Sequence, residues 1–291
     1  MTAIGYEPRR LARPVSLQLP RLGASMRRIR WGDRLSISFF LFVCLVAVIG
    51  PVLAPFDPIE RVADPFLSPG GRFLLGTDES GRDVWSRILY GVRSTWVSTL
   101  VVLAITGAIG AIVGTVAGTA GGWVDSALMR IVDLFLSLPG PLIAIAVVAA
   151  MGPSLIHTLI GISIVWWPWY ARIVRNEVRA IAARPHVEAA RLAGSRGWRL
   201  GRRHLFPGTI APLTVTISLD VATLILTLTA LSFLGLGAPP PEPELGSMLA
   251  SSVGYILVHP LLPILPSLAV TVLAFAGNLI GDTSQALLEA R

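Results

Sequence analysis

The sequence contains no lysine, so every one of its 24 basic residues is arginine. A nucleotide-binding loop of the G-x-x-x-x-G-K-[ST] type needs a lysine ammonium at the β- and γ-phosphates. This chain cannot build that loop, and an ATPase of that kind has to be a separate partner.

Charged residues are also scarce. They make up 14% of the 291 residues, whereas 53% are hydrophobic, and soluble domains carry about 25% charged residues. An apolar excess of this size needs lipid rather than water around it. The composition excludes an ordinary soluble domain and indicates a polytopic membrane protein.

Cysteine and histidine are rare as well, with one and four residues. The single cysteine, Cys44, lies in an apolar run, which excludes a disulfide within the chain and a cysteine-cluster metal site. The histidines show no ligand spacing such as H-x-x-x-H, and the chain has no paired acids, nucleophile elbow or H-E-x-x-H motif. We therefore expect no metal site, no catalytic site and no cofactor in this chain.

What the sequence has in abundance is long apolar runs. A helix needs about 20 apolar residues to cross the roughly 30 Å of hydrocarbon in a bilayer, and continuous apolar character favours helices over barrel strands. Pro139 and Pro141 should kink the third run. The predicted fold is all-α, with six transmembrane helices at residues 35–54, 95–118, 131–151, 154–170, 209–236 and 261–280.

The arginines predict how these helices are oriented. Eight lie in residues 1–34 and nine in residues 172–207, and loops rich in arginine stay in the cytoplasm. Because a membrane topology with these loops in the cytoplasm accounts for where the arginines lie, we expect contact with membrane lipid and none with nucleic acid. The expected order is a cytoplasmic basic tail (1–34), a first helix (35–54), an extracytoplasmic loop (55–93), a five-helix core (94–285) with a cytoplasmic loop (172–207), and a cytoplasmic end (286–291).

The loop over 172–207 contains a predicted short helix. Pro185 can start it, Glu188 is favourable in its first turn, and Gly194 can end it in a left-handed cap. Ala189 and Ala190 make the helix slim enough to enter a groove on another protein. Composition alone leaves a second interpretation open, an amphipathic helix that lies on lipid headgroups.

The motif in this loop resembles the EAA coupling motif of permease subunits of binding-protein-dependent ABC importers. It consists of Glu-Ala-Ala, three further residues, a glycine, nine residues and a tetrapeptide that ends in proline. The resemblance implies that the short helix docks in a cleft of an ATP-binding cassette subunit and transmits its closure to the membrane helices. The implied ATPase-coupling residues are Glu188, Ala189, Ala190, Arg191, Gly194, His204 and Pro207.

A second block, residues 75–87, precedes the second apolar run. It reads LGTDESGRDVWSR and resembles the G-T-D-x-x-G-R-D-x-x-S-R signature of the second permease subunit in dipeptide, oligopeptide and nickel importers. Its acids and arginines, including Arg87, can pair locally, and Val84, Ile88 and Leu89 are expected to face the membrane surface. We expect a structural clamp rather than direct substrate contact. The signature residues are Gly76, Thr77, Asp78, Gly81, Arg82 and Asp83.

A third block, residues 231–249, resembles the F-L-G-L-G-x-x-P-P-x-P-E-W-G-x-M-L stretch of the same subunit, with Leu245 in place of the tryptophan. Its four prolines predict a stiff outer loop. The resemblance as a whole implies a type I, MetI-like permease fold in a bacterial inner membrane. The implied partners are a homologous second permease in a heterodimer, two cytoplasmic ATPases that bind the ATP, and an extracytoplasmic solute-binding protein. Di- or oligopeptides are the expected solute, with nickel or another small solute as the alternative.

Two acids, Asp133 and Asp220, fall within apolar runs. A charge at the bilayer centre costs about 2.5 to 3.5 kcal/mol, so each should face protein or water. Both are candidates for lining the pathway, although Asp133 can instead lie at the interface beside Arg130, and Asp220 can form an interhelical hydrogen bond. In a rival interpretation, an ion-coupled secondary transporter, they would be relay groups.

Glycines recur every four residues along the second apolar run, at Gly110, Gly114, Gly118 and Gly122. Such spacing lets two helix backbones approach closely. It predicts a helix or subunit interface.

Overall fold

The computed structural model describes residues 31–195 and 197–289, and the regular elements of this part are all helices. The predicted basic tail lies outside the described residues except for 31–34, as do Arg196 and the last two residues. The elements are α1 (Trp31–Leu53), α2 (Val84–Ala120), α3 (Gly122–Ser137), α4 (Gly140–Met151), α5 (Leu155–Ala182), α6 (Pro185–Leu192), α7 (Gly197–Leu200), the π-helical η2 (Gly201–Leu205), α8 (Phe206–Phe233), α9 (Leu245–Ser252), the 3-10 helix η3 (Val253–Tyr255) and α10 (Leu261–Glu289).

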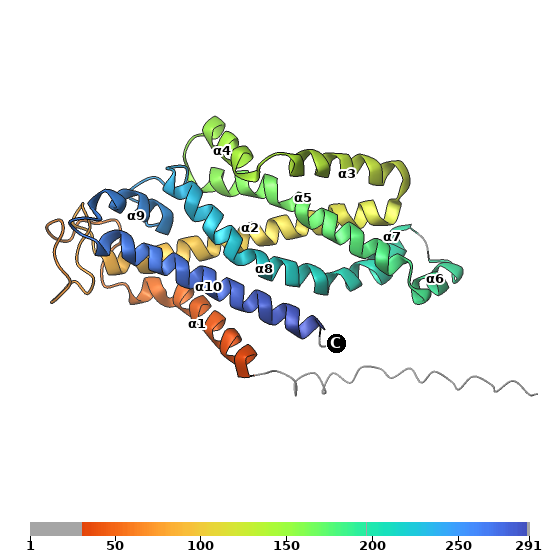
Figure 1. The fold of residues 1–291 in the computed structure, drawn as a ribbon, viewed down its shortest axis with the longest axis horizontal. Helices are drawn as coiled ribbons and strands as arrows, with labels where there is room; N and C mark the ends of the chain where they lie inside the picture. The colour runs from red at the N-terminus through yellow and green to blue at the C-terminus, as the bar shows by residue number, and fades with distance from the viewer. Residues whose placement is uncertain (1–30, 196, 290–291) are drawn as a thin grey trace, which may run out of the picture.

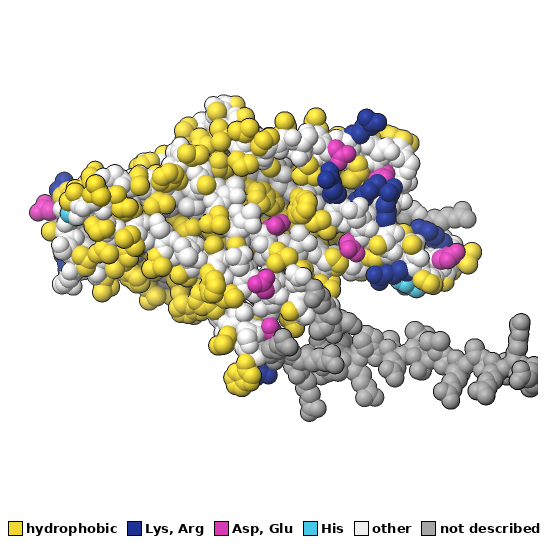
Figure 2. Space-filling view, viewed as in Figure 1, with side chains coloured by type: hydrophobic (Ala, Val, Ile, Leu, Met, Phe, Trp, Pro, Cys, Tyr) yellow, Lys and Arg dark blue, Asp and Glu magenta, His cyan; other side chains and the backbone are white. Residues whose placement is uncertain are grey.

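The long helices run side by side along the long axis of the molecule (Figure 1). α1, α2, the α3–α4 pair, α5, α8 and α10 follow one another in alternating directions along it. The loop before α2 and the short helix α9 lie at one end, and α6 lies at the other. We call these the α9 end and the α6 end. On the face shown in Figure 2, apolar side chains extend along the bundle and charged side chains gather toward the α6 end.

Four helices of the described part are long and apolar enough to cross a membrane: α1, α2, the continuous helix Gly201–Phe233, and α10 over Leu261–Leu288. α3 and α4 qualify only as a pair bent by 87°, which raises the number to as many as five. The chain is therefore an all-helical membrane protein with four to five candidate spans.

The predicted kink in the third run is confirmed, and it is a full break. α3 ends at Ser137, and Leu138 and Pro139 have extended backbone conformations. A proline disfavours the helical conformation in the residue before it, which ends α3 here. The expected contribution of Pro141 is wrong, because it lies in the first turn of α4, where a proline fits a helix without bending it.

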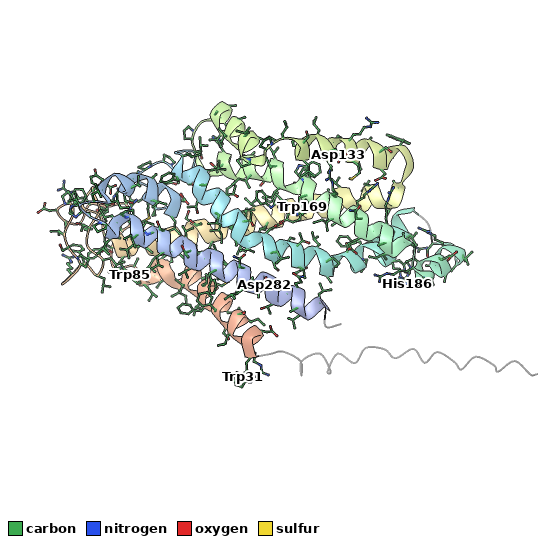
Figure 3. The ribbon with its side chains drawn as sticks, in the orientation of Figure 1. Trp31, Trp85, Asp133, Trp169, His186 and Asp282 are labelled. Atoms are coloured by element: carbon green, nitrogen blue, oxygen red, sulfur yellow. The ribbon has the colours of Figure 1, made fainter. Side chains whose placement is uncertain are left out.

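α5 extends well past the predicted boundary at Tyr170, to Ala182. Trp169 consequently lies near the middle of the helix (Figure 3). The hydropathy pattern ends where the arginines begin, but arginine is a good helix former. The segment 172–207 therefore contains the last turns of α5, then α6, α7, η2 and the start of α8.

The glycine repeat forms the seam between α2 and α5. A Cβ atom on Gly114 would lie 2.5 Å from the carbonyl oxygen of Ala171 and 2.9 Å from the nitrogen of Arg175, so only glycine permits this approach. The predicted close packing is thus confirmed as a contact between helices of one subunit. Gly122 is not part of it, because it begins α3 with a φ of +54° and has no neighbour within 4 Å.

Candidate functional site

The short helix α6 has the expected boundaries. Pro185 is its first residue, Glu188 lies in its first turn, and Gly194 follows its end with a φ of +89°. Each of these is a local signal: proline fits the first turn, an acid suits the positive helix start, and glycine tolerates the left-handed conformation.

α6 is held to the rest of the molecule mainly by a residue that the motif does not contain, and Ala190 of the motif packs against the same cluster. Val187 is the one buried residue of this helix, at 0% exposure. It belongs to a hydrophobic cluster with residues of α5, α7 and η2, namely Val174, Val178, Ile181, Leu200 and Leu205. Glu188, Ala189 and Arg191 are exposed, and Ala190 is half-buried. α6 thus has one face packed on α5 and another face open.

The motif residues do not form a single cluster. Glu188 and Arg191 line a hollow of about 690 Å³ together with Thr119 of α2 and the ends of α5 and α7. His204 lies in η2 and is half-buried, and Pro207 lies in the first turn of α8. Since Pro207 has no N–H for a bond to the residue four positions earlier, the wider π turn of η2 accommodates it.

Ion pairs join α3 to α5 near the α6 end. Asp125 of α3 is buried and accepts hydrogen bonds from Nε and Nη2 of Arg175, at 2.8 and 2.7 Å, and from Arg179 at 2.5 Å. Asp133, also on α3, forms an ion pair with Arg172, and its side chain is 62% exposed. Asp133 of α3 is therefore paired with α5. Figure 3 shows Asp133 and His186 toward the same end.

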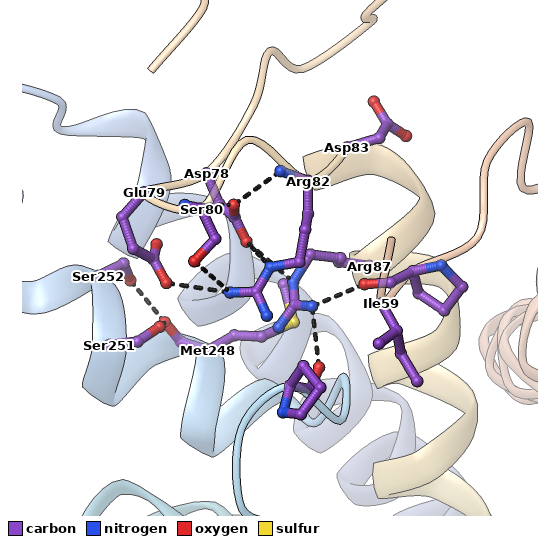
Figure 4. A network of polar contacts seen from close by, with 12 residues as sticks. Ile59, Asp78, Glu79, Ser80, Arg82, Asp83, Arg87, Met248, Ser251 and Ser252 are labelled. Carbon is purple, nitrogen blue, oxygen red and sulfur yellow. Dashed lines mark hydrogen bonds and ion pairs between the residues drawn. The ribbon is translucent and has the colours of Figure 1, made fainter. Parts of the chain in front are cut away.

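The signature at the α9 end forms a buried polar network (Figure 4). Asp78 accepts from Nε of Arg82 at 2.7 Å and lies 3.3 Å from Nε of Arg87, and Arg82 also pairs with Glu79 at 3.2 Å. We call these four residues the outer network. The local pairing expected for Asp78, Arg82 and Arg87 is confirmed. The pairing expected for Asp83 with an arginine is wrong, because Asp83 caps α2 by accepting from the nitrogen and hydroxyl of Ser86 at 2.8 and 2.7 Å.

The other signature residues shape the loop around this network. Gly76 and Gly81 have φ values of +79° and +77°, and a Cβ on either would clash with a backbone carbonyl. The hydroxyl of Thr77 donates to the carbonyl of Asp64 at 2.7 Å and accepts from the nitrogen of Leu67 at 2.9 Å. Each residue therefore supports a turn or a crossing of the loop on itself.

Arg87 connects this loop to the third block. Its Nη1 donates to the carbonyl of Pro58 at 2.7 Å and to that of Pro241 at 3.0 Å. The expectation that Val84, Ile88 and Leu89 face the membrane surface is wrong, because all three are buried in the protein. Val84 and Ile88 belong to the core cluster that includes Leu245 and Met248 of the third block and Leu262 of α10. Leu89 lies against Gly50 of α1.

Glu244 is a buried acid that the sequence did not single out. It is 0% exposed, caps α9 by accepting from the nitrogens of Gly246 and Ser247 at 3.1 and 2.9 Å, and accepts from the hydroxyl of Thr95 at 3.3 Å. Burial raises the pKa of Glu244 above its ordinary value, and the two backbone bonds oppose that shift only in part.

Asp220 lies half-buried on α8 near Tyr170 and Trp166 of α5. Within the described residues, its Oδ2 and the Tyr170 hydroxyl are buried without a hydrogen-bond partner. It belongs to a row of half-buried or exposed polar residues on one side of α8, spaced by four, three and four. We call this row the polar stripe; its members are Thr216, Asp220, Thr223 and Thr227.

The long apolar helices, the short helix packed on one face and the buried outer network define an all-helical membrane protein. Residues 110–291 match the family of binding-protein-dependent transport system inner membrane components. The chain belongs to that family, within its group of DppC- and NikC-like ABC permeases. It is a multi-pass inner-membrane permease subunit, not an enzyme, and the secondary-transporter interpretation is thereby set aside.

Three curated relatives illustrate the similarity. The chain is 35% identical to the dipeptide transport system permease protein DppC of Haemophilus influenzae, over 86% of this chain and 88% of that protein. It is 40% identical to the di/tripeptide permease DppC of Pseudomonas aeruginosa (84% and 83%). It is 35% identical to the nickel permease NikC of Escherichia coli K12 (87% and 92%).

A solved structure shares the fold. A chain of the MetNI methionine ABC transporter in an inward-facing conformation matches with a TM-score of 0.52 and 20% identity, over 69% of this chain and 95% of that one. The predicted MetI-like permease fold is confirmed by this match.

Proposed function

We propose that this chain forms one half of the membrane pathway of an ATP-driven importer of di- or oligopeptides. A homologous second permease forms the other half of a heterodimer, with two cytoplasmic ATPases and an extracytoplasmic solute-binding protein. Relatives that are 35% and 40% identical and are named for dipeptides and di- or tripeptides support this substrate. The nickel permease makes nickel, or another small solute, the alternative.

The proposed topology has six crossings, with both termini in the cytoplasm. α5 has 28 residues, a length of about 42 Å, which is enough to cross roughly 30 Å of hydrocarbon. The bent α3–α4 pair is the third crossing. The arginines around α6 favour the cytoplasm for that end, which puts the outer network and α9 on the side of the solute-binding protein.

The observation that carries the proposal is the two-faced exposure of α6. Glu188 and Ala189 are open to a partner, whereas Val187 is buried against α5. A movement of α6 therefore reaches α5. The glycine seam ties α5 to α2, and the pairs of Asp125 and Asp133 tie it to α3. When ATP closes the ATPases on α6, these three helices tilt together from the inward-open to the outward-open state.

We also propose that the polar stripe of α8 lines the pathway. Polar side chains of a membrane helix face protein or water, because exposure to hydrocarbon is costly. Asp220 is the charged member of the stripe. In this role the outer network, including Arg87, holds the rim of the pathway rigid, and it does not contact the solute.

Uptake by the complex in proteoliposomes tests the proposed function. We expect uptake of labelled dipeptide that requires ATP, the ATPases and the binding protein, and that survives collapse of the proton gradient. Glu188→Arg should abolish uptake with the subunit still in the membrane. Uptake of nickel but not of dipeptide would overturn the peptide assignment, and uptake without the ATPases would overturn the coupling mechanism.

Thiol labelling tests the pathway. In a Cys44→Ser background, Thr223→Cys on the stripe should react with a water-soluble thiol reagent, whereas Leu226→Cys, on an exposed apolar face of the same helix, should not. Asp220→Ala should lower uptake without lowering assembly. Equal labelling of both cysteines, or normal uptake by well-expressed Asp220→Ala, contradicts this role.

A further inference from the structure

An apolar groove of about 590 Å³ runs between α2 and α8, and α1 and α10 contribute to its walls. Along α8 it extends from Phe206 to Val221, a length of about 22 Å. One leaflet accounts for about half of the roughly 30 Å hydrocarbon layer, so the groove is deep enough for an acyl chain. Its lining includes Phe40, Ala104, Ala108, Ile210, Ile217 and Ile280.

A basic hollow is formed by α7, η2 and the start of α8, where the groove's lining along α8 also begins. It measures about 740 Å³ and is lined by Arg199, Arg202, Arg203 and Pro207. Both hollows are lined by the first turn of α8, the groove by Phe206 and the basic hollow by Pro207. All three arginines are exposed, and no carboxylate among residues 31–195 and 197–289 forms an ion pair with them.

The arginines and the groove suit the two parts of one molecule. Guanidinium groups bind phosphate oxygens through paired hydrogen bonds, and basic pockets between transmembrane helices at the cytoplasmic surface bind anionic headgroups. We propose that the two hollows form a single binding site for an anionic phospholipid. One acyl chain lies in the α2–α8 groove, and the phosphate contacts Arg202 and Arg203.

The arginines determine which lipid binds. An acyl chain that enters the groove leaves a bilayer that is equally apolar, so its transfer contributes little selectivity. The anionic headgroup, in contrast, gains ion pairs with the arginines at this site. We therefore expect phosphatidylglycerol and cardiolipin to bind, and phosphatidylcholine, which has no net charge, to be excluded. The site is independent of the transported solute.

Native mass spectrometry of the purified transport complex, titrated with each of these lipids, tests the proposal. An arginine near an anionic surface contributes roughly fivefold in affinity, so Arg202→Gln with Arg203→Gln should weaken phosphatidylglycerol binding about 30-fold. Ala108→Phe, which fills the groove at an exposed position of α2, should also remove the lipid. Arg93→Gln and Ala150→Phe are matched controls at exposed positions elsewhere and should bind it normally.

Three results would overturn the proposal. The first is unchanged lipid binding in both the arginine and the groove variants. The second is displacement of the lipid by inorganic phosphate with no effect of Ala108→Phe, which would indicate a site for a free anion. The third is quantitative cross-linking of Ala108→Cys to the second permease in the assembled complex, because protein would then fill the groove.

Discussion

Replacing Val187 by alanine should separate ATP hydrolysis from transport. Val187 is the side chain that α6 buries against α5, α7 and η2. The substitution removes two methyl carbons from a fully buried site, which costs about 1.6 kcal/mol in transfer free energy. The cavity left in the cluster adds to this, for a total of about 2 to 3 kcal/mol.

This cost affects the packing of α6 on α5 rather than the fold of the whole chain. A loss of about 2 kcal/mol raises the ratio of detached to packed α6 about 30-fold. The substitution does not change the exposed face around Ala189, so the ATPases should stay bound to α6 and hydrolyse ATP. The movement of α6 no longer reaches α5, so the number of peptides imported per ATP should fall severalfold.

The assay compares ATP hydrolysis and peptide uptake in the same proteoliposomes. Ala189→Trp on the open face of α6 is the matched variant, and it should release the ATPases instead of uncoupling them. Normal uptake per ATP in Val187→Ala would refute the reasoning. Loss of the ATPases in Val187→Ala would refute it too, because the buried face would then serve ATPase binding.

Three further predictions concern the packing of the helices and the α9 end. Gly114→Ala pushes α2 away from α5, at a cost of about 1 to 3 kcal/mol. The melting temperature of this variant in detergent should fall. Gly254→Ala is the control, because its Cβ has free space, and it should melt at the wild-type temperature. Arg87 reaches Asp78 through Nε and two carbonyls through Nη1, whereas lysine donates from a single nitrogen. Arg87→Lys should therefore lose at least one of these contacts, at a cost of about 1.5 to 3 kcal/mol, and the loop over 55–83 should become sensitive to protease. The exposed Arg93→Lys is the control, and equal resistance of the two variants contradicts the role of Arg87. Glu244 binds its proton more tightly in the folded state, so its contribution to stability is present below pH 4.5 and lost as pH rises through its raised pKa. As pH rises through this range, the melting temperature of wild type should therefore fall relative to that of Glu244→Gln. If the melting temperatures of the two proteins changed with pH in parallel, the raised pKa of Glu244 would be contradicted.

Local signals in the sequence predicted several local features correctly, but not the places of Pro141, Asp83 and Gly122. Pro185 and Gly194 act through backbone restrictions of single residues, and the boundaries of α6 follow from them. The seam through Gly114 follows from a spacing that repeats along one helix. The break at Pro139 follows from the missing N–H and from the restriction on the preceding residue.

Features that depend on distant partners could not be predicted in this way. Val187 is one aliphatic residue in an alanine-rich segment, and its burial depends on how α5 and α7 approach it. A glutamate in a proline-rich loop is expected to be exposed, and Glu244 is buried only because α2 and α9 pack around it. The continuation of α5 was missed because arginines usually mark a membrane boundary. Here Arg172 and Arg175 pair with acids of α3 instead.

The most direct test of the account is cross-linking from Ala189→Cys in a Cys44→Ser chain within the intact complex. The account predicts that this cysteine captures an ATPase subunit and is protected from a membrane-impermeant reagent applied from outside the cell. Labelling from outside, or a complete failure to capture an ATPase while uptake is normal, would contradict it.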